Sequence, residues 1–140
     1  MITNEQKQKI EENWENDFWA SSSRSKSANV VKLKEYFLEE NSTPYKIDIS
    51  DEYVLKDIFL GVLHVLPEKA WEYILYEDNL NSSKVKYIFK SSSYVILRHL
   101  PFLLEKYEEE FIFCINKLLI ESEAKAQYIE ALLEYDFKIV

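Results

Sequence analysis

Apolar side chains recur at helical spacing along most of this chain, and the pattern predicts a series of amphipathic helices. At the N-terminus, Thr3 and Gln6 have the spacing of a capping box, in which side chains satisfy the first backbone amides of a helix. Three apolar residues then follow at intervals of four: Ile10, Trp14 and Phe18. We therefore expect a first helix over 3–19 with these side chains on one face.

Polar residues and prolines mark where the next helices begin. A serine-rich break at 21–27 precedes a second expected helix over 27–40. Asp51 is the expected N-cap of the strongest helical pattern, whose apolar residues are Val54, Leu55, Ile58, Phe59, Val62 and Leu63. Pro67 ends that helix and suits the first turn of the following one, because proline lacks a backbone N–H.

The same kind of pattern continues toward the C-terminus. Ser82 or Ser83 is the expected cap of a helix that three serines at 91–93 interrupt, which marks a bend or break. Pro101 opens another helix, and Ser122 caps the last one.

The predicted fold class is all-α, with six to seven helices in antiparallel hairpins. Their arrangement is either a HEAT-like stack or an irregular bundle, in a single domain over 1–140. Residues 45–49 and 137–140 have a β-like pattern and are candidates for a minor two-stranded element.

An internal similarity links two segments at an offset of 34 residues, 53–73 and 87–107. Identical pairs include Tyr53 with Tyr87, and the Leu-Pro pair at 66–67 with that at 100–101. A period of this size is typical of helix-hairpin arrays, whose units stack to bury their apolar faces. The alternative is that amphipathic helices ending in Leu-Pro resemble each other by chance.

The chain contains one glycine, Gly61, and this deficit excludes several classes of site. Loops that cradle phosphates and the turn that carries an α/β-hydrolase serine both need glycine at fixed spacing. Gly61 itself lies within the strongest helical pattern, where glycine is unfavourable relative to alanine. We expect it to allow close approach of a second helix, so that Gly61→Leu destabilises the protein.

Catalytic and metal-binding patterns are missing from the sequence. The single cysteine, Cys114, lies among apolar residues and is expected to be a buried, inert thiol. His64 and His99 lack the glutamates of known metal motifs, so we expect no cofactor and no metal. Asp57 and His64 share a helix face and are a candidate pair. An enzyme with an unrecognised site is one alternative function.

The N-terminus is polar and no apolar run is long enough to span a membrane, so we expect a soluble, cytoplasmic protein. Its net charge is −8, which favours a partner with a basic surface over nucleic acid or a membrane. Aromatic residues make up 15% of the chain, and such side chains are enriched in protein interfaces.

Two groups of acidic and aromatic residues are the candidate partner-binding sites. One follows Pro67 and comprises Glu72, Tyr73, Tyr76, Glu77 and Asp78. The other comprises Glu105, Glu108 and Glu109. Tyrosine beside a carboxylate suits recognition of lysine and arginine, because the ring offers packing and the acid offers charge. The alternative is that both groups are solvated helix faces.

Two basic segments, 24–34 and 84–98, contain four Lys or Arg residues each and no acid. They either dock against acidic helices within the fold or form a basic face that holds phosphates. The second case makes the protein a small nucleic-acid-associated regulator, which is the other alternative function.

In its segments 53–78 and 87–110, with their helices, aromatic residues and acids, the chain resembles bacterial immunity proteins. These proteins neutralise the toxins of contact-dependent growth inhibition and related polymorphic toxin systems. The chain resembles that type of protein in being small, acidic, aromatic-rich and helical. The resemblance implies that an acidic, aromatic face covers the active site of a basic toxin domain, such as a nuclease, without catalysis by this chain. It assigns no individual residues.

Overall fold

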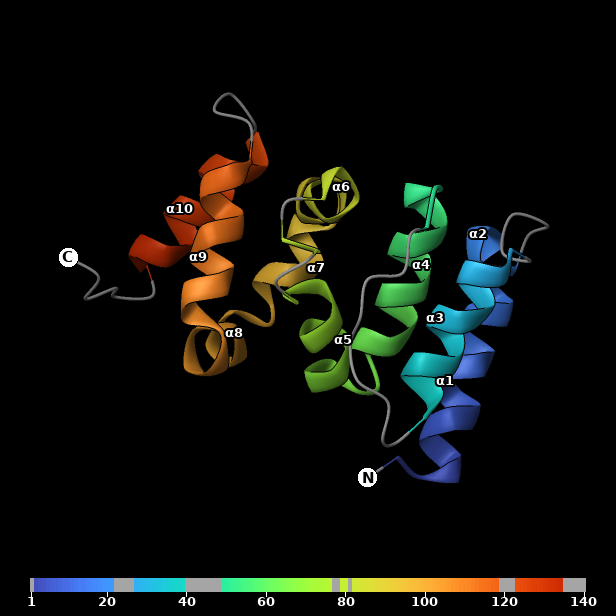
Figure 1. Cartoon of the computed structure of the whole chain (residues 1–140). Helices are drawn as coiled ribbons and strands as arrows, with labels where there is room; N and C mark the ends of the chain where they lie inside the picture. The colour runs from blue at the N-terminus through green and yellow to red at the C-terminus, as the bar shows by residue number, and fades with distance from the viewer. Residues whose placement is uncertain are drawn as a thin grey trace. The chain divides into compact units, whose positions relative to one another are not determined.

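The computed structural model describes residues 2–21, 27–39, 49–76, 79–80, 82–118 and 123–134 (Figure 1). Within these ranges the chain forms ten helices and no strand, which confirms the all-α class. The residues group into two compact units, Met1–Asn79 and Leu80–Val140. The single domain over 1–140 and the choice between stack and bundle stay predictions.

Unit 1 contains α1 (Asn4–Asn16), α2 (Phe18–Ser21), α3 (Ala28–Leu38), α4 (Glu52–Leu63) and α5 (Pro67–Ile74). Unit 2 contains α6 (Ser83–Ser91), α7 (Ser93–Leu97), α8 (Leu100–Lys106), α9 (Glu108–Lys117) and α10 (Glu123–Glu134).

The number of helices differs from the six to seven predicted because three expected helices are broken. Asp17 separates α1 from α2, Ser92 separates α6 from α7, and Tyr107 separates α8 from α9. Only the break at Ser92 had a signal in the sequence, the run of three serines. The predicted β element falls on 45–49 and 137–140, of which only Ile49 belongs to the described residues, and no strand occurs among these.

Local capping explains where several helices of unit 1 begin. Thr3 and Gln6 form the predicted capping box of α1, and the Asp51 carboxylate accepts from the backbone N–H groups of Tyr53 and Val54. At the other end of α1, Asp17 adopts an extended conformation and turns the chain. Phe18, predicted to share the buried face of Trp14, is therefore 71% exposed.

Helix α4 is the centre of unit 1 and contacts α1, α2 and α5. Its buried apolar residues are Val54, Leu55, Ile58, Phe59, Val62 and Leu63, which confirms the apolar face predicted for this segment. Phe59 packs edge-on against Trp71 of α5, with ring centroids 5.2 Å apart. Phe37 of α3 packs in the same way on Tyr73 of α5, at 5.5 Å.

The contact between α1 and α4 passes through Gly61. The Asn13 side-chain amide donates to the Gly61 carbonyl (2.9 Å), and the Trp14 indole N–H donates to the Ile58 carbonyl (3.1 Å). A Cβ atom on residue 61 would lie 2.8 Å from Cδ1 of Trp14. The single glycine thus serves the close helix approach predicted for it.

Unit 2 is organised around α10, which contacts α6, α7 and α9. The rings of Phe89, Phe111 and Tyr128 form its aromatic core, with centroids 5.9 to 6.1 Å apart. The Tyr128 hydroxyl donates to the Phe89 carbonyl (2.7 Å), so this buried phenol is hydrogen-bonded. Ser93 donates to the Gln127 side chain at 2.8 Å and joins α7 to α10.

The two similar segments have related local structures. In both, a helix begins at the Leu-Pro pair, with proline in its first turn. Helix α4 is continuous, whereas its counterpart in unit 2 is divided into α6 and α7 at Ser92. Ser92 occupies the position that corresponds to Ile58, a fully buried apolar residue of unit 1. The apolar contact that stabilises the middle of α4 is thus replaced by a polar residue at the break.

Candidate protein-binding surfaces

The acidic and aromatic side predicted for the segment after Pro67 is only partly exposed. Glu72 is exposed and Tyr76 is half-buried, whereas the apolar residues Trp71, Ile74 and Leu75 are buried. Glu77 and Asp78 lie outside the described residues. Glu68 lies one helical turn before Glu72 and is also exposed, so these two carboxylates form an acidic edge on α5.

Tyr73 is not a surface residue. It is 2% exposed, and its ring lies against Tyr36 and Phe37 of α3 at centroid distances of 5.9 and 5.5 Å. Tyr73 therefore belongs to the core between α3 and α5, and a partner cannot reach it in the folded protein. The sequence placed it on the polar side because its neighbour Glu72 and the following Tyr76 are polar.

The second predicted group lies where α8 meets α9 in unit 2. Glu105, Glu108 and Glu109 are all exposed there. The last two, with Glu110, occupy the first turn of α9, which has no side-chain cap. Carboxylates stabilise a helix N-terminus through its dipole, so this cluster has a structural role that needs no partner.

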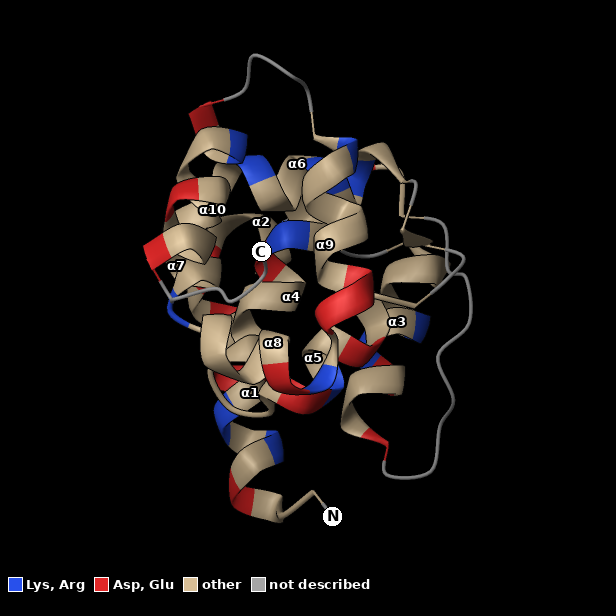
Figure 2. Ribbon diagram, turned by 90° about the vertical axis from the view of Figure 1, so that its left-hand side faces the viewer, with Lys and Arg blue, Asp and Glu red and all other residues tan. Residues whose placement is uncertain are grey.

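The negative charge of the chain belongs mostly to unit 1. Its sequence contains 16 Asp and Glu against nine Lys and Arg, a net charge of −7. Unit 2 contains nine acids against eight bases, a net charge of −1. Figure 2 shows basic segments on α6 and acidic segments on α8 and at the start of α9. Unit 2 therefore has positive and negative charges mainly on different helices, with almost no net charge. Attraction of a basic partner is therefore expected chiefly from unit 1.

The first basic segment is used in part within unit 1. Lys34 donates from Nζ to the Ala20 carbonyl (3.2 Å) and lies over the Trp14 ring, and burial lowers its pKa. Lys32 is exposed, and Arg24 and Lys26 lie outside the described residues. Lys34 is therefore used within unit 1, but its partners are a carbonyl and an aromatic ring rather than an acidic helix, so the docking of this segment on acidic helices stays a prediction.

The second basic segment carries an exposed aromatic–cation pair. The Arg98 guanidinium lies 4.4 Å from the Tyr94 ring centroid and donates to the Tyr94 hydroxyl at 2.5 Å. Tyr94 is 71% exposed and Lys90, one turn earlier in the sequence, is exposed as well. The role of this segment in binding nucleic acid stays a prediction.

The candidate pair of Asp57 and His64 does not form. Seven residues along a helix correspond to about 10 Å, beyond hydrogen-bond reach. His64 is the exposed C-cap of α4 and lines a shallow depression with Glu5, Gln6 and Lys9 of α1. Within the described parts of the chain, no group of three His, Cys, Asp or Glu side chains is placed to hold a metal ion.

Cys114 is buried, as predicted, at 3% exposure on α9. Burial, and secondly the Glu110 carboxylate, raise the pKa of its thiol to about 12. Since the thiolate is the reactive form, we expect native protein to react with iodoacetamide at about pH 8 at least 100-fold more slowly than protein unfolded in guanidinium. Mass spectrometry over time measures this ratio, and equal rates would show that the thiol is accessible.

Two carboxyl groups face each other where α1, α2 and α4 meet. Asp57 of α4 is 6% exposed, and its Oδ2 atom has no hydrogen-bond partner. Burial, followed by the hydrogen bond and the charge of Asp17, raises the pKa of Asp57 from 3.8 to about 7. The Lys56 charge and the backbone N–H of Trp19 act in the opposite direction but do not offset this. We call Asp17 and Asp57 the acid pair.

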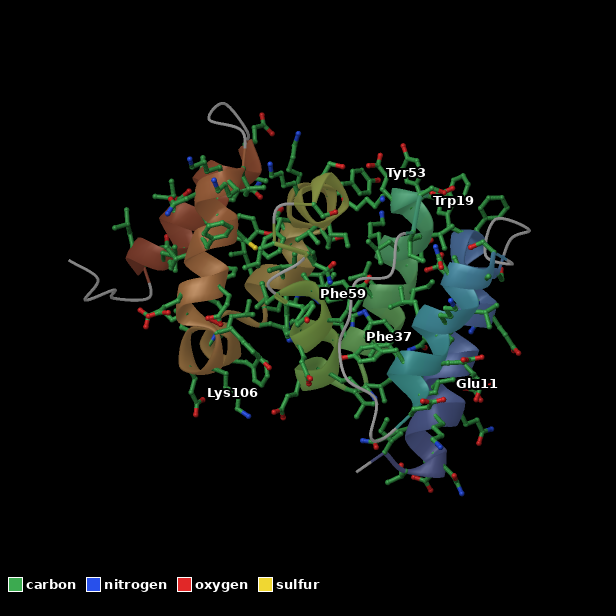
Figure 3. The ribbon with its side chains drawn as sticks, in the orientation of Figure 1. Glu11, Trp19, Phe37, Tyr53, Phe59 and Lys106 are labelled. Atoms are coloured by element: carbon green, nitrogen blue, oxygen red, sulfur yellow. The ribbon has the colours of Figure 1, made fainter. Side chains whose placement is uncertain are left out.

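Three aromatic rings lie beside the acid pair. Trp19 and Tyr53 stack at a centroid distance of 5.3 Å with their planes 25° apart. Figure 3 labels both residues near the start of α4. Phe18 contacts Trp19 edge-on at 4.9 Å. Phe18 is 71% exposed and Tyr53 is 40% exposed. We call these three residues the aromatic cluster.

Two local features of the chain position the acid pair and the aromatic cluster: helical spacing on α4 and the break between α1 and α2. Tyr53 and Asp57 are four residues apart on α4 and so lie on the same face. Asp17, Phe18 and Trp19 are consecutive at the break between α1 and α2, which turns them toward that face. The regular apolar spacing predicts a first helix that continues through Asp17, so this arrangement was not expected from the sequence. The four-residue spacing of Tyr53 and Asp57 was the signal available.

Comparison with known proteins gives no relative: no family model, no curated protein and no solved structure matches the chain. The helices described here include none with the length and apolar character needed to cross a membrane. Any function must therefore be argued from the surfaces themselves.

Proposed function

We propose that this chain is a non-enzymatic protein-binding protein, and that it acts as an immunity protein that neutralises a bacterial toxin domain with a basic surface. The observation that carries the proposal is the net charge of −7 in unit 1, together with exposed carboxylates such as Glu68 and Glu72. The proposal includes a cytoplasmic location, where such a toxin would act. The resemblance to immunity proteins described above supports the same conclusion.

Charge of this kind acts first on the rate of association. A negative surface steers a positive partner, which raises the association rate by one or more orders of magnitude at low ionic strength. Nuclease toxin domains are basic where they bind phosphates, so an acidic protein that occupies that surface excludes the substrate. Inhibition then needs no catalytic group on this chain.

If this chain is an immunity protein, we expect its toxin to be encoded directly upstream. The probe is therefore the C-terminal domain of the protein encoded there, and its toxicity and its binding to this chain are measured separately. Coexpression is expected to restore growth of cells that express the C-terminal domain of that protein. The double variant E68K/E72K is expected to associate about tenfold more slowly at low salt, because two attractive charges on α5 become repulsive. Stopped-flow fluorescence measures the rate.

The matched control is the double variant E130K/E134K. Glu130 and Glu134 are also an exposed pair one turn apart, but they lie on α10 of unit 2. Equal slowing by both double variants would contradict a binding surface on α5 and indicate only an effect of total charge. No protection and no binding by the unmodified protein would overturn the proposed function.

A further inference from the structure

We propose that the aromatic cluster of unit 1 is an anchor of the interface with the partner protein, and that it binds a partner segment in which an aliphatic side chain lies between lysine or arginine residues. This inference rests on the proposed function and deepens it, since it names the surface and the chemistry that hold the basic partner. The cluster consists of Phe18, Trp19 and Tyr53.

The aromatic cluster is where unit 1 leaves aromatic surface open to solvent. Phe18 is 71% exposed and Tyr53 is 40% exposed, and both rings contact the half-buried ring of Trp19. Trp19 and Tyr53 lie near the start of α4 (Figure 3). Among the described residues of unit 1, Val31 is the one other large apolar side chain that is exposed. Large aromatic side chains that gather at the surface are typical of protein interaction sites and dominate their binding energy.

The fold holds the cluster in place before a partner binds. The Trp19 backbone N–H donates to Oδ1 of Asp17 (3.3 Å) and also to the buried carboxyl of Asp57. Asp57 thus ties Trp19 of α2 to α4 from inside the fold and needs no contact with the partner. Rings that are already positioned lose little conformational freedom on binding, which favours affinity.

The charges around the cluster decide the character of its occupant. The cluster and its flanking residues come from two short segments, 15–19 and 51–57. The exposed or half-buried charged side chains of these segments are four carboxylates and one ammonium: Glu15, Asp17, Asp51, Glu52 and Lys56. The faces of aromatic rings also carry negative potential. A basic partner surface is therefore complementary to the surroundings of the cluster, whereas an acidic one is repelled.

The rings themselves favour an apolar group at the centre of the contact. Phe18 has no hydrogen-bonding group on its side chain, so its exposed surface gains free energy by leaving water. An aliphatic side chain packs on this surface, and lysine or arginine residues on either side of it reach the flanking carboxylates while their stems lie along the rings. The two parts affect different rate constants, because charge acts mainly on association and close packing acts mainly on dissociation.

The site is tested first without the partner, by three short synthetic peptides. One alternates lysine and leucine, the second lysine and serine, and the third glutamate and leucine, so that charge and apolar content vary separately. Each is titrated into the full chain at low salt, and the tryptophan indole N–H signals are followed by NMR. Trp14 and Trp71 are buried, so the Trp19 signal reports on the cluster. We expect the lysine–leucine peptide to shift this signal and to bind about fivefold more tightly than the other two.

The variant Phe18→Ser separates the cluster from the charge of unit 1. Because Phe18 is 71% exposed, the substitution should leave the melting temperature nearly unchanged. It should weaken binding of the lysine–leucine peptide about fivefold and leave binding of the lysine–serine peptide unaffected. Tyr94→Ser is the matched control, since Tyr94 is equally exposed but lies on α7 of unit 2, and no change at the Trp19 signal is expected.

The same variant has a kinetic signature with the C-terminal domain of the upstream protein. Phe18→Ser is expected to raise the dissociation rate about tenfold with little effect on association, whereas E68K/E72K slows association. Stopped-flow fluorescence measures both rate constants. Unchanged dissociation together with slower association in Phe18→Ser would show that the cluster is not a packed contact.

Several results of the peptide experiment would overturn the inference. These are an unmoved Trp19 signal, equal binding of the lysine–leucine and lysine–serine peptides, and equal binding of the glutamate–leucine peptide, which would show that any apolar segment is accepted. A second copy of the chain is the other occupant that the test addresses. Sedimentation velocity is expected to give a monomer, and a dimer that Phe18→Ser dissociates would replace the basic partner by self-association.

Failure of this site and failure of the proposed function give different results. If the upstream domain binds and is neutralised but Phe18→Ser changes neither its dissociation nor peptide binding, the site is wrong and the function stands. If the peptides bind at Trp19 as expected but the upstream domain does not bind, the site stands and the proposed function is wrong.

Discussion

Replacing Asp57 with asparagine is expected to raise the melting temperature of the protein at about pH 8. Asp57 is buried on α4 beside Asp17, and its Oδ2 atom has no hydrogen-bond partner. At this pH the folded protein must keep a negative charge in a place from which water is largely excluded. Asparagine has a similar shape and no charge, and its amide can donate to the Asp17 carboxylate.

The pH dependence follows from the direction of the pKa shift. Asp57 has a pKa of about 7 in the folded protein, against an ordinary value of 3.8. Between these values the folded state binds one proton more than the unfolded state, so the free energy of unfolding falls as the pH rises. The stabilising effect of the proton is complete below about pH 4 and is lost as the pH passes about 7. At about 1.4 kcal/mol for each pKa unit, the loss amounts to a few kcal/mol.

Thermal unfolding of the protein and of Asp57→Asn, followed by circular dichroism between about pH 5.5 and about pH 8.5, measures the effect. We expect the melting temperature to decline across this range for the unmodified protein and to change little for the variant. Groups that the two proteins share contribute to both pH profiles, so the difference between the profiles isolates residue 57. Glu11→Gln, which removes an exposed carboxylate from α1, is the control and should leave the decline intact. A variant with the same pH dependence as the unmodified protein would contradict the raised pKa.

Helix ends were the features that the sequence predicted best, because caps depend on residues close together in the chain. The Thr3–Gln6 capping box, the Asp51 N-cap and the proline starts at 67 and 101 are confirmed. Ser27 and Ser82 also accept from backbone N–H groups at the starts of α3 and α6. Each involves groups within three residues of one another, so one sequence carries the full signal.

Features that depend on distant residues were missed. The break at Asp17 interrupts a regular apolar spacing, so Phe18 was placed on a buried face although it is exposed. Tyr73 has polar neighbours in sequence but is buried by Tyr36 and Phe37, more than 30 residues away. The acid pair joins residues 40 positions apart. Periodicity alone cannot report contacts between helices, and such contacts bring together the acid pair and the aromatic cluster.

Substituting alanine for Gly61 is expected to destabilise the protein, although alanine is the better helix former. The new Cβ would lie 2.8 Å from Cδ1 and 2.9 Å from Nε1 of Trp14, closer than such atoms pack. Trp14 is buried and its indole N–H donates to the Ile58 carbonyl, so the ring cannot move aside without losing that bond. Overpacking of this kind costs about 1–3 kcal/mol, against a gain of about 1 kcal/mol in helix propensity. Gly61→Leu should cost more, because its side chain is larger.

A double-mutant cycle with Trp14→Phe identifies the cause of this loss. Phenylalanine is smaller than tryptophan, so it should leave room for the new Cβ, and the two substitutions together should destabilise less than the sum of their separate effects. Phe37→Leu is the control partner, since Phe37 packs on Tyr73 rather than at Gly61, and its effect should add to that of Gly61→Ala. Urea unfolding gives the four free energies of each cycle. Stabilisation by Gly61→Ala would mean that helix propensity outweighs the contact, and that α1 and α4 do not need glycine at their crossing.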